Sequence, residues 1–199
     1  MYRRTAARSR TCGSGICGSS LLASTKGCLL PRPRYRVLCL LATSVHFGRE
    51  GTQEGWVYLA VVIDIASRRV VGWATADHLR TELVADALSA ACRRRRPTQP
   101  VIFHSDRGCQ YTSGAFAELA GRLGVRLSVG RTGQCWDNAL AESFFAKLKG
   151  ELLGDRPWPS RAAARSAIFE FIEGWYNLHR LHSSLGYRSP AAYEAAYTA

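Results

Sequence analysis

Residues 55–74 read GWVYLAVVIDIASRRVVGWA. They hold two runs rich in β-branched and aromatic side chains, 56–64 and 68–74, with the short segment 65–67 between them. Such side chains favour strands, and a connection this short favours two neighbouring antiparallel strands. The residues therefore predict a β-hairpin.

The chain that follows the hairpin alternates between helical and strand patterns. It predicts helices over 79–96, 113–123 and 160–178 and around Glu142, and strands over 101–104 and 125–128. This order predicts an α/β fold with a mixed sheet flanked by helices. The first helix ends in four arginines, 93–96, which suit the negative end of a helix. We interpret this run as a solvated helix end rather than a dedicated DNA clamp.

Two carboxylates, Asp106 and Glu142, stand at positions where a metal site could form. Asp106 follows the apolar run 100–103, and groups beyond the carboxyl ends of strands commonly hold ligands in open α/β sheets. On the next predicted helix, apolar residues recur every four positions and leave Glu142 roughly on the opposite side. Either Asp137 or Asn138 can cap that helix, because both side chains accept hydrogen bonds from free N–H groups. An Asp in a turn and a Glu on a solvated helix are common, so this pair alone is weak evidence.

The sequence motifs around the two carboxylates are more specific evidence than the pair itself. Asp106 lies in HSDRGCQYTS at 104–113, and Glu142 follows GQCWDNA at 133–139. The predicted hairpin and the C-terminal words WYN at 175–177, RLHSSLGY at 180–187 and SP at 189–190 complete an ordered set. This set resembles the DDE transposases of bacterial insertion sequences, of the OrfB type, whose catalytic core is of the retroviral-integrase type. These enzymes end their motif in an Asp, 35 residues and a Glu, which is the separation of Asp106 and Glu142 here. The resemblance runs from about residue 55 to residue 193.

The resemblance implies an RNase-H-like fold and metal-dependent phosphoryl transfer, or strand transfer, on the DNA ends of an insertion sequence. Asp106 and Glu142 would be the catalytic metal ligands for Mg²⁺ or Mn²⁺, hard cations that prefer oxygen ligands. Two such ions about 3.5–4 Å apart clamp the attacking and leaving oxygens of a phosphodiester. The implied partners are DNA, further copies of the chain and a helix-turn-helix protein from a partner reading frame. Candidate DNA contacts are Lys149, which lies seven residues beyond Glu142, and Lys147, Arg107, Arg131 and Arg180.

Residues 1–50 differ from the rest of the chain. Residues 1–49 hold nine Lys or Arg and no Asp or Glu, whereas residues 50–199 hold eighteen basic and fifteen acidic residues. A basic arm that contacts DNA phosphates is one interpretation, and a secretory signal fits poorly because the apolar run 37–42 is short. We favour translation from a wrong frame or a wrong start. We therefore expect an irregular basic segment over 1–50 and a catalytic core with a C-terminal helical extension over 51–199.

The first catalytic aspartate of the family has no counterpart in the sequence. In these transposases an Asp-Ile/Val-Thr-Tyr motif precedes the Gly-Trp pair by about nine residues, a spacing that reaches His46 here, and no Asp precedes Asp64. Asp64 is a candidate substitute metal ligand, although the family has a separate Asp at that position. The alternative to an active transposase is a catalytically inactive DNA-binding remnant. A structure-specific nuclease on the same fold would lack the C-terminal words.

Composition excludes other classes of protein. No apolar run reaches about 18 residues, which argues against a membrane span. The seven cysteines have spacings that fit zinc sites poorly, and a reduced cytoplasmic protein is the simpler interpretation. His179 and His182 lie three residues apart without a third ligand nearby, so packing or DNA contact suits them better than a metal.

Overall fold

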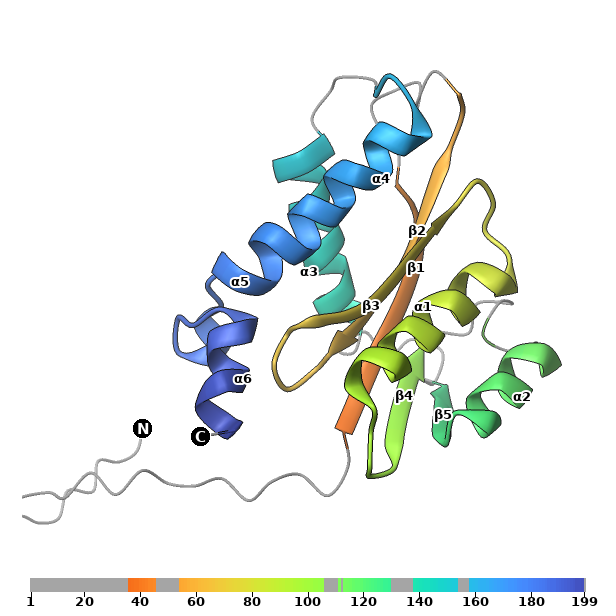
Figure 1. Cartoon of the computed structure of the whole chain (residues 1–199), viewed down its shortest axis with the longest axis vertical. Helices are drawn as coiled ribbons and strands as arrows, with labels where there is room; N and C mark the ends of the chain where they lie inside the picture. The colour runs from red at the N-terminus through yellow and green to blue at the C-terminus, as the bar shows by residue number, and fades with distance from the viewer. Residues whose placement is uncertain are drawn as a thin grey trace, which may run out of the picture. The chain divides into compact units, whose positions relative to one another are not determined.

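A mixed five-stranded sheet runs through the described part of the chain (Figure 1). The computed structural model describes residues 36–45, 54–105, 111, 113–129, 138–153 and 158–198. The strands are β1 (Arg36–Val45), β2 (Val57–Asp64), β3 (Val70–Ala76), β4 (Val101–Ser105) and β5 (Val125–Val129), in the spatial order β3-β2-β1-β4-β5. β1, β2 and β3 pair antiparallel, whereas β1, β4 and β5 pair parallel. The mixed sheet predicted from the sequence is confirmed.

The predicted hairpin forms from β2 and β3. Tyr58 pairs with Ala76 at its open end and Ile63 with Val70 next to its turn, and the register shifts between Val62 and Ile63. Arg68 has a φ of 61° in the turn, and its N–H donates to the Asp64 carbonyl at 2.7 Å. A residue with positive φ and a local bulge allow the chain to reverse over so few residues.

β1 corrects the expectation of an irregular segment up to residue 50. Arg36–Val45 pairs with β2 along its length, from Leu38 opposite Asp64 to Val45 opposite Val57, and with β4 from Arg36 to Cys39. Its apolar run is short, but a strand between two others obtains backbone hydrogen bonds from both sides. Residues 1–35 and 46–53 lie outside the described residues, so the boundary at residue 50 and the wrong-frame origin stay predictions.

Helices cover the two faces of the sheet (Figure 1). α1 (Thr81–Arg95) and α2 (Gly114–Arg122) pack against one face, and α3 (Asn138–Leu148) and α4 (Arg161–Phe169) against the other. Successive side chains of a strand point to opposite faces, so Ala60 and Val62 of β2 join the first core and Leu59, Val61 and Ile63 join the second. β2 is consequently buried on both sides. Gly72 lets α1 come close, because a Cβ there would lie 2.4 Å from the Ala87 carbonyl oxygen.

The predicted helix at 160–178 is a continuous helical run that changes its winding. α4 leads into a wider π-type segment, η2 (Glu170–Tyr176), and then α5 (Asn177–His179). A second π-type segment, η1 (Lys149–Leu153), follows α3 directly. The chain ends in a short turn, η3 (Ser183–Leu185), and α6 (Pro190–Thr198). Within the described ranges no helix is long and apolar enough to cross a bilayer.

Candidate active site

Glu142 is solvent-exposed on α3. The opposite side of the helix is buried: Phe144, Phe145 and Leu148 lie in the core beneath the sheet, with Leu140 packed against the same cluster. The helical periodicity of these apolar residues therefore predicted the orientation of Glu142 correctly. No hydrogen bond or ion pair joins the Glu142 carboxylate to another described residue. A carboxylate that is held by its helix but not engaged by neighbours suits a metal ligand.

Three of the predicted site residues, Asp106, Arg107 and Arg131, lie outside the described residues. Their placement relative to Glu142 stays a prediction. The strand that leads to Asp106 is described: β4 ends at Ser105, which is buried, and it lies between β1 and β5.

The pairing register of β1 and β4 shows which residues of β1 lie level with the end of β4. Cys39 pairs with His104, so Ser105 is level with Leu40, and Leu41 is the next position. Leu41 also pairs with Val61 of β2, whose side chain packs in the same core as Phe144 of α3. A carboxylate shared with residues after β4 would therefore belong at or next to Leu41. β1 holds no acidic residue at all, and His46 lies beyond its end.

Asp64 occupies a different place. It is buried, with 3% of its surface exposed, and it pairs with Leu38, three positions before Leu41 on β1. Three residues of strand, about 10 Å, separate it from the level of Val61. Its Oδ1 accepts hydrogen bonds from the N–H groups of Ala66 at 3.0 Å and Ser67 at 3.4 Å, and its Oδ2 lies 3.4 Å from the Arg95 guanidinium. Asp64 thus stabilises the hairpin turn.

Glu194 of α6 extends this network and fastens the C-terminal helix to the hairpin. Its carboxylate accepts hydrogen bonds from Ser67 Oγ at 2.7 Å, Arg69 at 2.6 Å and Arg95. Burial alone would raise the pKa of Glu194, but the hydrogen bonds from Arg95, Arg69 and Ser67 outweigh it and lower the pKa to about 2. The solvated-end interpretation of 93–96 is wrong for Arg95, which is 14% exposed.

Glu194 gives the fold a defined acid response. Because its pKa falls from the usual 4.5 to about 2 on folding, its stabilisation is complete above pH 4.5 and is lost as the pH falls towards 2. Glu194→Gln should lower the free energy of unfolding at pH 7 by about 2 kcal/mol, measured by urea titration. The difference from the parent chain should shrink at pH 3. Glu118→Gln, at an exposed position of α2, is the control. A difference that stays constant between pH 7 and pH 3 would contradict the assignment.

Asn177 is a second residue whose role the sequence did not indicate. It is 1% exposed, and its side chain acts as a substitute backbone: Oδ1 accepts from the Val70 N–H and Nδ2 donates to the Val70 carbonyl, both at 3.0 Å. The signal available in the sequence was an amide directly after the aromatic pair Trp175-Tyr176. For Glu194 the signal was an isolated acidic residue, because residues 174–193 contain none.

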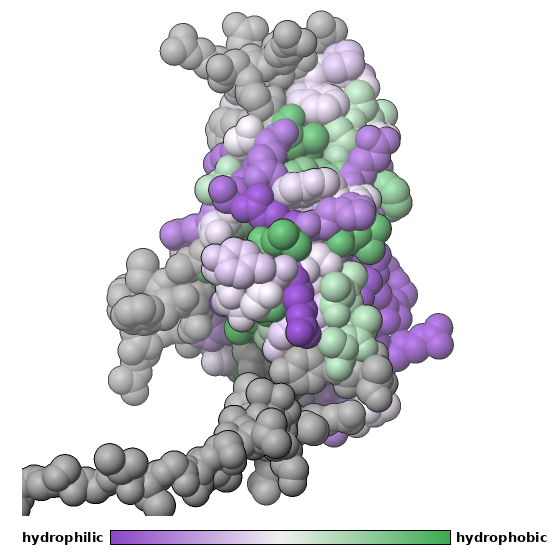
Figure 2. All heavy atoms as spheres, turned by 90° about the vertical axis from the view of Figure 1, so that its left-hand side faces the viewer, coloured by the Kyte–Doolittle hydropathy of each residue, from purple (hydrophilic) through white to green (hydrophobic). Residues whose placement is uncertain are grey.

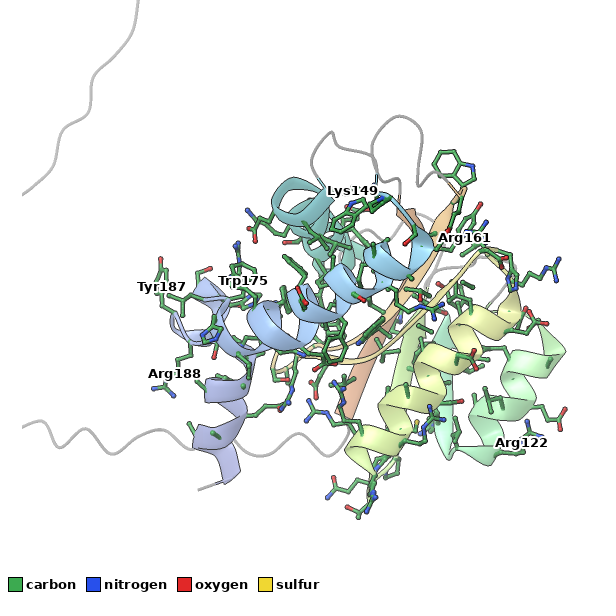
Figure 3. The ribbon with its side chains drawn as sticks, turned by 45° about the horizontal axis from the view of Figure 1, so that its top comes forward. Arg122, Lys149, Arg161, Trp175, Tyr187 and Arg188 are labelled. Carbon is green, nitrogen blue, oxygen red and sulfur yellow. The ribbon has the colours of Figure 1, made fainter. Side chains whose placement is uncertain are left out.

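The candidate DNA contacts that the structure describes lie on or beside α3. Lys147 and Lys149 are both exposed, and Lys149 is labelled in Figure 3. Arg180 is partly buried, with its guanidinium 2.7 Å from Glu151 Oε1 and 5.6 Å from the centre of the Trp175 ring. The two lysines are therefore available to a phosphate group, whereas Arg180 already has two partners.

Comparison with known protein families identifies the family to which this chain belongs. Two models described as the integrase core domain match residues 43–135 and 123–190. The chain belongs to the integrase core domain family. The chain is also similar in sequence to transposases of insertion sequences. It is 42% identical to the transposase for insertion sequence element IS904 of Lactococcus lactis and 43% identical to transposase InsF for IS3A of Escherichia coli, each over 143 residues. These alignments cover 72% of this chain but 56% and 50% of the relatives, so the chain spans about half their length.

Solved integrase cores share the fold. The catalytic core of BIV integrase aligns with a TM-score of 0.55 at 19% identity, over 81% of this chain and 96% of that one. The HTLV-2 integrase core in complex with magnesium aligns with a TM-score of 0.56 at 15% identity, over 78% and 93%. These cores confirm the RNase-H-like fold, and the family match and the transposase relatives confirm the resemblance to DDE transposases with an integrase-type core.

Proposed function

We propose that this integrase core acts in the cytoplasm on the DNA ends of an insertion sequence, by metal-dependent strand cleavage and strand transfer. The observation that carries the proposal is the ordered match over residues 43–190, which includes an exposed Glu142 on a helix packed against the sheet. The proposed partners are the DNA ends, further copies of the chain and a helix-turn-helix protein from a partner reading frame.

Asp106 and Glu142 are the proposed ligands of Mg²⁺ or Mn²⁺. Glu142 fits this role, since its carboxylate is exposed and has no partner among the described residues, and carboxylate oxygens are the ligands such ions prefer. The bound ions would supply alignment of the nucleophile with phosphorus and stabilisation of the developing charge. The magnesium in the related HTLV-2 core supports the choice of metal. No group of three or more possible ligands occurs among the described residues, which leave out Asp106.

The proposal is tested with a labelled duplex that carries one end of the element, incubated with the chain and Mg²⁺ or Mn²⁺. The chain with a restored first-strand aspartate should nick this end in preference to a scrambled duplex. Equal nicking of both duplexes would instead indicate an unspecific nuclease.

A catalytically inactive DNA-binding remnant is the second candidate. The specific observations that favour it are the absence of any acidic residue on β1 and the engagement of Asp64 by Ala66, Ser67 and Arg95. A carboxylate with those partners would have to give them up to bind a metal, and it would leave the Arg95 guanidinium with one partner fewer. This candidate retains the DNA contacts and loses the chemistry.

Lys149 provides a test of binding that is independent of cleavage. Lys149→Ala should weaken binding to end DNA and reduce the slope of log affinity against log salt by about one, because one phosphate contact fewer releases fewer counterions. The measurement is fluorescence anisotropy over a salt series. Arg122→Ala removes the same charge from α2, away from Lys149 (Figure 3), and should leave the slope unchanged. Identical slopes for Lys149→Ala and the parent would refute the contact.

A further inference from the structure

Exposed apolar side chains concentrate at the C-terminal end of the described chain. Six large hydrophobic residues are exposed in the described residues, and four of them lie between 175 and 187. Their exposed fractions are 37% for Trp175, 48% for Leu178, 59% for Leu181 and 73% for Tyr187. We call Trp175, Leu178, Arg180, Leu181, Tyr187 and Arg188 the Tyr187 surface. Figure 3 shows Trp175, Tyr187 and Arg188 at the same side of the molecule.

The loop that presents Tyr187 is built tightly. The Tyr187 N–H donates to the His182 carbonyl at 2.9 Å, and the His182 N–H donates to the Arg188 carbonyl at 3.2 Å. Gly186 and Tyr187 both adopt positive φ, 64° and 56°. Glycine does so freely, but a bulky side chain in this conformation costs about 1–2 kcal/mol. A tyrosine held in this way with most of its surface exposed contributes little to the core, so fold stability does not explain it. Strained residues of this kind cluster at ligand contacts.

The charge around Tyr187 points to an anion. Residues 174–193 contain no Asp or Glu, but they contain two arginines, Arg188 and Arg180, of which Arg180 is paired with Glu151 at 2.7 Å. The nearest acidic residues in sequence are already paired, Glu173 with Arg94 at 2.7 Å and Glu194 with Arg69 at 2.6 Å. Arg188 is exposed and has no ion pair among the described residues. Hydrophilic and hydrophobic side chains are interleaved on this side of the molecule (Figure 2).

We propose that the Tyr187 surface binds unpaired nucleotides of DNA. Tyr187, and the exposed part of the Trp175 ring, would stack on base faces, and Arg188 would contact a phosphate. Exposed aromatic rings beside arginines suit this ligand, because every base offers a flat face and each nucleotide carries one negative charge. A continuous duplex hides its base faces, whereas unpaired nucleotides expose them. The inference rests on the proposed function of acting on DNA and assigns it a binding site away from Asp106 and Glu142 in the sequence.

Tyr187→Gly is the decisive variant. Glycine adopts the positive φ of this position without strain, so the substitution should not lower the melting temperature. It removes the ring and should weaken binding of fluorescein-labelled oligo(dT) about tenfold, as expected for loss of one stacked base. Binding of a duplex of matched length should change less than about twofold. Tyr187→Phe retains the ring and should bind oligo(dT) nearly as tightly as the parent chain.

Charge variants separate the two components of the site. Arg188→Ala should weaken binding of oligo(dT) and of heparin, which is anionic but has no bases, whereas Tyr187→Gly should leave heparin binding unchanged. Arg122→Ala controls for the loss of one positive charge and should change neither affinity. All assays use the full chain of 199 residues.

Several results would overturn the inference. Unchanged affinity of Tyr187→Gly for oligo(dT), in a parent chain that binds DNA, would remove the Tyr187 surface and leave the proposed function standing. An equal loss for oligo(dT) and duplex would show an ordinary backbone contact instead of stacking. A change in sedimentation of Tyr187→Gly, with oligo(dT) binding intact, would identify the surface as an interface between copies. A parent chain that binds neither form of DNA would refute the proposed function as well.

Discussion

Replacing Asp106 or Glu142 by Ala, in a chain whose first-strand aspartate has been restored, should abolish strand cleavage and leave binding of end DNA unchanged. Loss of a direct metal ligand should exceed the ten- to hundredfold effect typical of residues that only support a ligand, so we expect a loss of about a thousandfold or more. The physical reason is that each carboxylate serves the metal and makes no direct contribution to holding the anionic duplex.

Matched variants make this result specific. Glu142→Gln keeps the shape of the side chain and removes its charge, so it should be as inactive as Glu142→Ala. Glu118→Ala removes an exposed carboxylate from α2 and should retain full cleavage. The measurement is the rate of nicking on a denaturing gel with Mg²⁺ or Mn²⁺, alongside affinity by anisotropy. Cleavage that survives in either Ala variant would exclude that residue as a ligand.

The chain as it stands should fold and bind DNA but show little or no strand transfer. The core residues that the structure describes run from residue 57 onwards, and the pairing of β1 with β2 and β4 completes the sheet. The site nevertheless lacks a first-strand carboxylate, and two carboxylates cannot readily hold two ions. Replacing the residues ahead of Gly55 by a family first strand that carries Asp-Ile-Thr-Tyr should recover cleavage.

The register sharpens the design of that restored strand. Counting along the sequence places the aspartate at His46, whereas the pairing of β1 with β2 and β4 places it at or next to Leu41. The strand that recovers activity should be the one that aligns its aspartate with Val61. Asp64→Asn in the unmodified chain tests the competing idea. Robust strand transfer by the unmodified chain that disappears in Asp64→Asn would show that Asp64 replaces the missing ligand.

Local patterns predicted the elements in which neighbouring residues determine the structure. The hairpin, α1, α2, α4 and the outward direction of Glu142 all follow from short-range periodicity. β1 escaped prediction because its pairing partners, β2 and β4, lie far along the chain and its flanks are basic and irregular in composition. The π-type winding of η2 escaped because the apolar positions 168, 171, 172 and 175 fit an ordinary helix equally well.

In the candidate site, too, short-range features were predictable and contacts between distant residues were not. The exposure of Glu142 depends on one helix and was predictable. The hydrogen bond that Asp64 accepts from Arg95 joins residues 31 positions apart and was not. Glu194 and Ser67 are 127 residues apart, and no sequence pattern links them. Networks of this kind depend on how the C-terminal helix docks, which spacing in the sequence does not encode. The distance between Asp106 and Glu142 belongs to the same class of long-range geometry and remains a prediction.

The amide of Asn177 also determines where the sheet stops. β3 is the outermost strand on its side of the sheet, and exposed strand edges are templates on which further chains can add by backbone pairing. At Val70, both backbone groups are already bonded to Asn177, so an incoming strand finds no donor or acceptor there. A single side chain from the C-terminal helical region thereby blocks the addition of another strand at Val70, next to the turn of the hairpin.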